Sequence, residues 1–203
     1  MPYTLDLGIN NEETYLQIAE EVLTLNLREE KKLELNRFFL LAIIQRAMMT
    51  SRGIEILYQD DNYEAAIPLM RILLDCALHI KASKMADNEE KYYNSILSGG
   101  QIRDNKDSYG KKLSEKNVAK SFDNENWVGG VYNVYDALNK HVHFSPTHIR
   151  QIVGKDKKIS IGMRMISTEQ EHVNNIKEYY NCITTVVIRM LEVSLDGLKQ
   201  RQQ

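Results

Sequence analysis

The sequence contains little of what interrupts helices or forms covalent frameworks: three prolines, ten glycines and two cysteines in 203 residues. Because proline and glycine break helices, their scarcity favours long uninterrupted helices over a fold with many tight turns. Cys76 and Cys182 each lie within an apolar helical pattern, which is typical of buried thiols in a reducing compartment. An apolar core, and no disulfide framework, is therefore expected to hold the fold together.

Long apolar runs and an excess of positive charge are also missing. The longest apolar run, Phe38 to Ile44, is far shorter than the ~20 residues that cross a bilayer. Residues 1–10 lack the basic start and apolar stretch of a signal peptide. At a net charge of -2 the chain has no general attraction to polyanions, so binding to nucleic acid requires a local basic patch. We expect a cytoplasmic protein that does not contact a membrane.

The segments between the prolines and glycines repeat their apolar residues with a period of about 3.6, which is typical of amphipathic helices. A chain of 203 residues has the usual length of one compact domain. We therefore predict an all-α fold, a bundle of about five to seven helices forming a single helical domain over residues 1–203. A small β-hairpin is predicted near residues 149–166, between Ile149 and Ile166.

Capping residues and apolar spacing locate the long helices. The first is predicted to begin after Asn10 or Asn11 and to end near Asn26, with Leu16, Ala19, Val22 and Leu23 facing the core. The remaining predicted helices run from about Leu33 to Tyr58, from Tyr63 to about Ala86, from about Asn126 to Ser145, and onward from Ser167 or Thr168.

The second and the last of these helices carry long apolar seams. In the second, the seam residues are spaced alternately four and three apart, as in helices that pack along their full length. Because one small bundle leaves part of two such seams uncovered, we predict a homodimer. The seams consist of Leu33, Arg37, Leu40, Ile44, Ala47, Ser51, Ile54 and Tyr58, and of Val173, Ile176, Tyr180, Ile183, Val187, Met190, Leu191 and Leu198.

The helix from Tyr63 is apolar around most of its circumference, as a central helix is. Its polar residues form one narrow stripe, Glu64, Arg71, Asp75 and His79, whose spacing places them on one face. One interpretation is that the stripe faces water, or that Arg71 and Asp75 neutralise each other inside the bundle. The other interpretation is that the stripe lines a cleft.

A second polar stripe, Tyr132, Asp136, Asn139 and His143, lies on the helix that stops before Pro146. This stripe is either a solvated outer face or a partner of the first stripe.

If the two stripes meet, the residue types present support acid–base chemistry on a phosphate. Arg71 stabilises the phosphate, and His143 or His79 moves a proton near neutral pH. Asp75 or Asp136 then orients the imidazole.

The segment Asn139-Lys140-His141-Val142-His143 resembles the Arg-Asn-x-x-x-His signature of HEPN domains, which are helical bundles of prokaryotic toxins, defence ribonucleases and nucleotide-binding modules. In that family the Arg and the His carry metal-independent RNA cleavage near a dimer interface. Leu138 stands at the Arg position here. The resemblance therefore implies a ribonuclease only if another arginine, such as Arg71, takes that role.

A looser resemblance covers residues from about Arg52 to Pro146. The run Tyr63–Asp75, followed by the run Tyr135–Pro146, is similar to an uncharacterised family of helical bacterial proteins. Members of that family carry an Arg with an acidic residue one turn later, then a Tyr-rich helix that ends in a His. This resemblance implies a fold but no activity.

The sequence offers little for metal or cofactor chemistry. His141 and His143 are two residues apart on a helix and point in divergent directions. Glu169-x-x-His172 has the spacing of half a di-iron site, but no second copy exists. No Gly-x-Ser-x-Gly elbow or phosphate-binding glycine loop is present either. We expect no metal and no cofactor.

Two functions of different classes remain open, and whether the chain is an enzyme is not decided by its sequence. The leading hypothesis is an HEPN-like protein that binds or cleaves RNA in a bacterial defence or toxin setting. The alternative is a non-catalytic interaction or oligomerisation protein whose polar stripes are structural. The candidate catalytic residues are Arg71, Asp75, Asn139 and His143.

Overall fold

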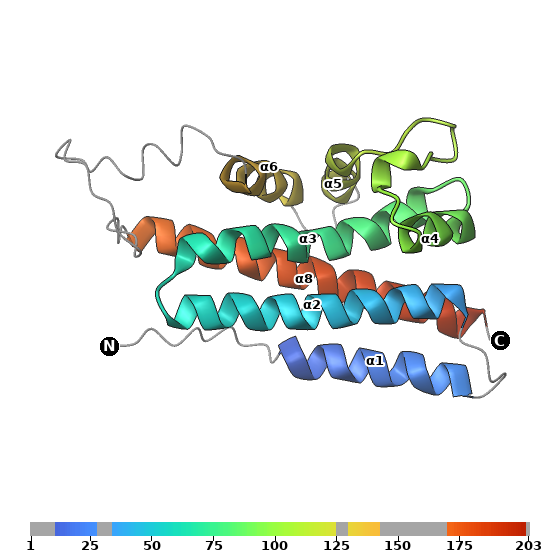
Figure 1. Cartoon of the computed structure of the whole chain (residues 1–203), viewed down its shortest axis with the longest axis horizontal. Coiled ribbons are helices and arrows are strands. Elements are labelled where there is room, and N and C mark those ends of the chain that lie inside the picture. Colours follow the sequence, from blue (N-terminus) through green and yellow to red (C-terminus); the bar gives the residue numbers. More distant parts are fainter. Residues whose placement is uncertain (1–10, 28–33, 125–129, 143–169, 202–203) are drawn as a thin grey trace.

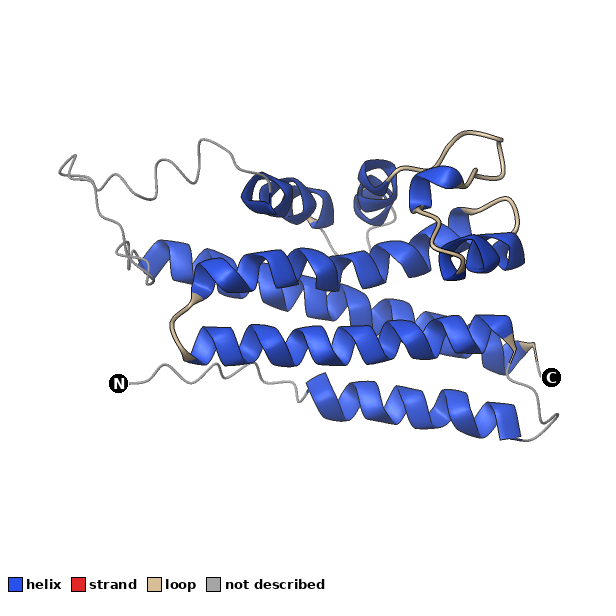
Figure 2. Cartoon of the chain, in the orientation of Figure 1, coloured by secondary structure: helices blue, strands red, loops and turns tan. Residues whose placement is uncertain are grey.

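The computed structural model describes residues 11–27, 34–124, 130–142 and 170–201, and these residues form an all-α bundle without a β-strand (Figure 2). The predicted fold class is confirmed, whereas the predicted hairpin at 149–166 lies outside the described residues. The helices are α1 (Asn11–Leu27), α2 (Leu35–Gln59), α3 (Tyr63–Met85), α4 (Glu89–Leu97), α5 (Glu115–Asn124), α6 (Val131–Val142) and α8 (Gln170–Gln200), with a 3-10 turn η1 (Ile102–Asp104).

Helix α3 is the centre of the bundle, as its apolar circumference predicts. It packs against α2, α4, α5, α6 and α8. In Figure 1, α5 and α6 lie along one side of α3, and α1 lies at the opposite edge of the molecule, beyond α2. Leu73 and Leu74 of α3 are buried in the core. This central position leaves α3 with one polar face, which it presents to α5 and α6.

The apolar seam of α2 is buried within the chain itself. Every predicted seam residue from Arg37 to Tyr58 is buried, because α1, α3 and α8 all pack against α2. The predicted seam residues of α8 from Ile176 to Leu198 are buried as well. The seams are therefore covered by other helices of the same chain, and the reason given above for a dimer no longer holds.

The inward face of α1 differs in part from the prediction. Val22 is buried as predicted and Ala19 is half-buried, but Leu16 and Leu23 are each 46% exposed, and Tyr15 and Ile18 are buried instead. Both sets of residues have helical spacing, so periodicity alone could not decide which set faces α2 and α8.

The two short helices α4 and α5 were not predicted, because each offers too few turns for a clear periodic pattern. The polar stretch between them is irregular but packed. Ile102 and Asn105 are buried there, and the backbone N–H of Leu113 donates to the carbonyl of Asn105.

Among the described residues, no helix combines the length and the apolar character needed to cross a bilayer.

Candidate functional site: the Arg71 cluster

The two polar stripes meet where α6 crosses α3. Arg71 Nε donates a hydrogen bond to Asn139 Oδ1 over 2.9 Å. Two turns earlier on α3, Glu64 Oε2 lies 3.9 Å from His141 Nδ1. Residues that stand 68 positions apart in the sequence are thus brought together by the packing of two helices.

The guanidinium of Arg71 is surrounded on several sides. It forms an ion pair with Asp75 one turn along α3 and lies 3.6 Å from Glu115 Oε2 of α5. Its central carbon also lies 4.8 Å from the centre of the Tyr135 ring, which places the cation over the aromatic face. Only 11% of the Arg71 side chain is exposed. We refer to Arg71, Asp75, Glu115, Tyr135 and Asn139 as the Arg71 cluster.

Asp75 is the carboxyl partner of Arg71 within this cluster. Burial raises the pKa of its carboxyl above the ordinary value, and the positive charges of Arg71 and Arg46 offset this only in part. Because one of its oxygens accepts a hydrogen bond from Arg71, a proton on Asp75 also weakens the hold on the guanidinium.

His79 lies two turns beyond Arg71 on α3 and faces α4 rather than α6. Its Nδ1 lies 2.9 Å from the hydroxyl of the buried Tyr92. Burial lowers the pKa of His79 below 6.5, and Arg46 and Arg71 lower it further against the carboxylate of Glu115. The imidazole Nδ1 of His79 and the Tyr92 hydroxyl share one hydrogen bond, whose direction depends on the tautomer of His79, and this contact with α4 is structural.

The remaining predicted site residues divide into two groups. Asp136 forms an ion pair with Lys140 at the surface, with Nζ and Oδ2 2.6 Å apart, and therefore does not belong to the Arg71 cluster. His143 lies outside the described residues. Leu138, which occupies the Arg position of the HEPN signature, is fully buried in the core. That position of the signature thus serves packing here.

Beside the Arg71 cluster, α5 and α6 form a basic and aromatic surface that sequence reasoning missed. Lys116 and Lys120 of α5 are exposed, and their Nζ atoms lie 6.0 and 5.0 Å from the centre of the Tyr132 ring on α6. The Tyr132 ring also lies nearly parallel to Tyr135, with ring centres 6.4 Å apart. The two lysines are separated by four residues, but without a predicted α5 nothing placed them beside a tyrosine of another helix.

The described residues hold no cluster of three or more side chains suited to bind a metal ion. Burial raises the pKa of the Cys76 thiol to about 12, so this cysteine is not a nucleophile at neutral pH. No family model matches the sequence, and no curated protein or solved structure was found that matches it.

Proposed function

We propose that this protein binds RNA on the surface formed by α5 and α6 and cleaves it with Arg71 and His143, as a divergent HEPN-like protein of bacterial defence or toxin systems. One observation carries the proposal. The HEPN-like segment lacks its arginine, yet Arg71 of α3 donates a hydrogen bond to Asn139, the second residue of that signature. An arginine from another helix thus stands beside the signature residue.

The residues of the α5–α6 surface have the chemistry that single-stranded RNA requires. Lys116 and Lys120 neutralise backbone phosphates, and Tyr132 offers a ring for a base to stack on. A phosphate drawn to these lysines reaches Arg71 by displacing Glu115, whose contact with the guanidinium is long and whose side chain is 43% exposed. Asp75 keeps Arg71 oriented during this exchange.

Cleavage then follows the metal-independent route. His143 removes the proton from a ribose 2′-hydroxyl, and the 2′-oxygen attacks the adjacent phosphorus while the bond to the 5′-oxygen breaks. The leaving 5′-oxygen takes up a proton from water, and a 2′,3′-cyclic phosphate remains. Arg71 stabilises the negative charge that develops on the phosphate oxygens.

The decisive experiment is RNA cleavage in the presence of a chelator. Arg71→Ala and His143→Ala are each expected to abolish cleavage, and the double variant is expected to be little worse than either, because the two residues act as one unit. Arg52→Ala is the matched control, since Arg52 is a surface arginine of α2. Circular dichroism checks that each variant keeps its helices.

Cleavage by Arg71→Ala at the rate of the unmodified protein refutes the catalytic role. RNA binding is tested separately, by the salt dependence of the affinity. Lys116→Ala and Lys120→Ala are each expected to weaken binding and to lower the salt slope by about 1, whereas Lys91→Ala on α4 leaves it unchanged. If the RNA affinity of all three variants has the same salt dependence, the α5–α6 surface is excluded as the RNA-binding site.

A second function has its own support. Arg71 is held by two carboxylates, an amide and an aromatic ring, which is the environment of a structural arginine. In that case the protein is a non-catalytic interaction module. If Arg71→Ala lowers stability and changes no RNA transaction, this function replaces the first.

A homodimer fits either function. Phe38, Met49 and Ile56 lie on one exposed face of α2, and Leu16 and Leu23 lie on one exposed face of α1. Sedimentation of Met49→Glu tests this face. A dimer that persists unchanged in the variant assigns the contact to another surface, and a monomeric unmodified protein removes the dimer altogether.

A further inference from the structure

A basic and aromatic loop, residues 101–112, leads into α5, and we refer to it as the Tyr109 loop. Four basic and two acidic side chains give it a net charge of +2, in a chain whose overall charge is -2. Figure 1 shows the loop on the same side of α3 as α5 and α6. Binding of a polyanion by an acidic chain requires such a local excess of positive charge. The basic residues are all exposed: Arg103, Lys106, Lys111 and Lys112.

The two acidic side chains of the loop bind its own backbone. Asp104 Oδ2 accepts a hydrogen bond from the N–H of Gln101 over 2.7 Å. Asp107 Oδ1 accepts from the N–H of Tyr109 over 3.0 Å and from the N–H of Lys111 over 2.9 Å. None of the four basic side chains forms an ion pair with another residue that the structure describes. The carboxylates thus fix the backbone, and the cations are left for an anion from outside the chain.

Two of these cations lie directly opposite each other. Lys106 and Lys112 form an antiparallel backbone bridge, so their side chains project from the same face of the loop. Residues paired in this way have Cβ atoms about 4.5–5.5 Å apart, and like charges placed there are destabilising. A phosphate bound between the two ammonium groups relieves that repulsion.

Tyr109 stands at the tip of the loop, and 93% of its side chain is exposed. The turn that carries it is ordered by the hydrogen bond from the N–H of Gly110 to the carbonyl of Asp107. Gly110 has a φ of 77°, which residues with a Cβ rarely adopt. Buried Ile102 and Leu113 anchor the two ends of the loop in the core. An aromatic ring presented on such a preformed turn loses little conformational freedom when a base stacks on it.

The Tyr109 loop is close enough to the α5–α6 surface for one strand to contact both. Tyr109 and Lys116 are seven positions apart in the chain, so their Cα atoms are separated by at most about 25 Å. A strand with phosphates about 3.4 Å apart covers this distance in about eight nucleotides. That length lies within the range of about 4–16 nucleotides that single-strand binding sites occupy.

We propose that the Tyr109 loop is a second contact for single-stranded RNA and that the protein therefore selects strands of about eight nucleotides or more. A base stacks on Tyr109, and Lys106, Lys111 and Lys112 neutralise the neighbouring phosphates. An acidic peptide also matches the charge, but the exposed ring favours a ligand with bases. The proposal rests on the RNA binding proposed for the α5–α6 surface and adds a minimum length to its substrate.

The test compares strands of four and of twelve uridines bound to the full chain, with dissociation constants measured by fluorescence anisotropy. Both strands carry 2′-O-methyl groups, because a strand without 2′-hydroxyls is not cleaved by the route proposed above. The long strand is expected to bind at least about tenfold more tightly, because it alone contacts both surfaces at once. Tyr109→Ala is expected to weaken binding of the long strand at least about fivefold and of the short strand less than about twofold.

Matched variants separate stacking from charge. Tyr109→Phe keeps the ring and is expected to bind the long strand within about twofold of the unmodified protein. Phe38→Ala, which removes an exposed ring of α2, is the control for Tyr109→Ala. The double variant Lys111→Ala/Lys112→Ala is expected to lower the salt slope for the long strand by about 1.4, whereas Arg52→Ala leaves it unchanged.

Three results overturn the proposal. In the first, Tyr109→Ala binds the long strand as tightly as the unmodified protein. In the second, it weakens the short and the long strand equally. In the third, it weakens binding of a polyglutamate peptide, a polyanion without bases, as much as binding of the long strand, and the loop then recognises an acidic protein segment.

The same titrations distinguish failure of the loop from failure of the α5–α6 surface. If Lys120→Ala weakens binding of both strands and Tyr109→Ala weakens neither, the α5–α6 surface stands and the Tyr109 loop is excluded. If Lys120→Ala changes the binding of neither strand, the RNA binding proposed for the α5–α6 surface fails, and its extension over the Tyr109 loop fails with it.

Discussion

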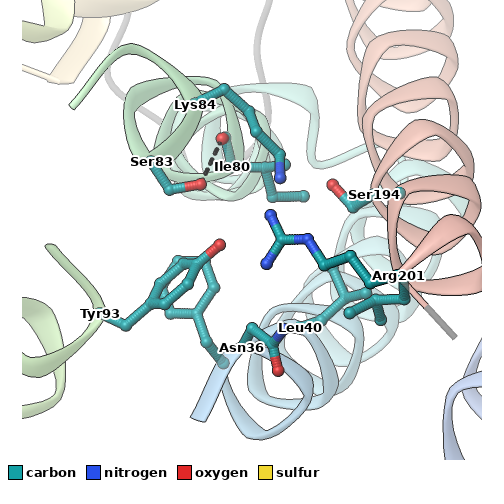
Figure 3. Close-up of a pocket in the computed structure, with 11 residues that line it drawn as sticks. Asn36, Leu40, Ile80, Ser83, Lys84, Tyr93, Ser194 and Arg201 are labelled. Carbon is teal, nitrogen blue, oxygen red and sulfur yellow. Dashed lines mark hydrogen bonds between the residues drawn. The ribbon is translucent and has the colours of Figure 1, made fainter. Parts of the chain in front are cut away.

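The Arg71 cluster and the pocket between α2, α3, α4 and α8 (Figure 3), called the α8 pocket below, both contain cations, but they differ in how far other groups of the chain neutralise these cations. Arg71 contacts Asp75, Glu115, Asn139 and the Tyr135 ring. Lys84 and Arg201 share the single carboxylate of Glu89, and the nearby Ser194 hydroxyl has no partner among the described residues. In the Arg71 cluster, which we call the closed region, carboxylates of the chain neutralise the cation. In the α8 pocket, which we call the open region, one carboxylate faces two cations.

This difference has a consequence for binding. At the Arg71 cluster one positive charge faces two carboxylates, so an anionic ligand must displace one of them and needs help from Lys116 and Lys120. At the pocket a monoanion completes the charge balance. The number of carboxylates around each cation therefore distinguishes cations that stabilise the fold from cations that can bind an anion. Each kind of cation can be tested by substitution.

The largest effect is expected in the helix that serves both regions. Leu73→Ala is expected to lower the free energy of unfolding by about 2–5 kcal/mol, because Leu73 is fully buried at the centre of α3. Since α3 also supplies Arg71 and Lys84, the loss should affect both regions together. Chemical denaturation measures the change, and a loss below about 0.5 kcal/mol contradicts the central role of α3.

The next effect separates the two regions. Arg71→Ala is expected to cost about 2 kcal/mol, because it removes a mostly buried cation and leaves Asp75 without its ion pair. Arg201→Ala is expected to cost less than about 0.5 kcal/mol, because Arg201 is 60% exposed. The measurement is urea denaturation of both variants at one salt concentration. Similar losses remove the distinction between a closed and an open region.

The pH dependence of stability should also differ between the regions. Near the Arg71 cluster, the folded pKa of His79 lies below 6.5, so its contribution to stability is present above pH 6.5 and is lost as the pH falls through the lower folded value. His79→Gln is expected to flatten the stability profile below about pH 6.5. An unchanged slope in that variant assigns the titration to another group.

At the pocket the corresponding loss is expected in a more acidic range. Burial raises the pKa of Glu89, but the hydrogen bonds and charges of Lys84 and Arg201 outweigh this and leave it below 4.5. Its contribution is therefore present above pH 4.5 and is lost as the pH falls further. Glu89→Gln should flatten the profile only below that pH. If Glu89→Gln alters the stability profile near pH 6, the pH ranges in which His79 and Glu89 contribute to stability are not separate.

The smallest effect concerns the open space itself. Gly197→Ala is expected to raise stability by about 0.5–1 kcal/mol, because alanine favours the helix and its methyl group meets no atom within 4 Å. Gly53→Ala in α2 is the control, since its methyl group lies 3.1 Å from Leu69 Cδ1 and gains less. Thermal denaturation compares the two. A gain at Gly53 that equals the gain at Gly197 shows that the pocket wall is not open.

Periodicity by itself determined the all-α class, the central position of α3 and the buried seam of α2. Each of these follows from apolar residues repeated over many turns, where a helical period is unmistakable. The same information placed only part of the inward face of α1, whose two apolar faces compete, and it missed α4 and α5, which are too short. The polar stripe of α3 was visible as well, because Arg71 and Asp75 stand one turn apart on the same helix.

Only the tertiary structure decided what these residues contact. Glu115 and Tyr135 contact Arg71 from two other helices, and no local sequence pattern predicts either contact. The α8 pocket joins residues near positions 40, 84, 93 and 194–201, which share neither a helix nor a period. Spacing along one helix shows which side chains share a face, but the crossing of helices sets which faces meet, and that depends on how all the apolar faces are buried at once.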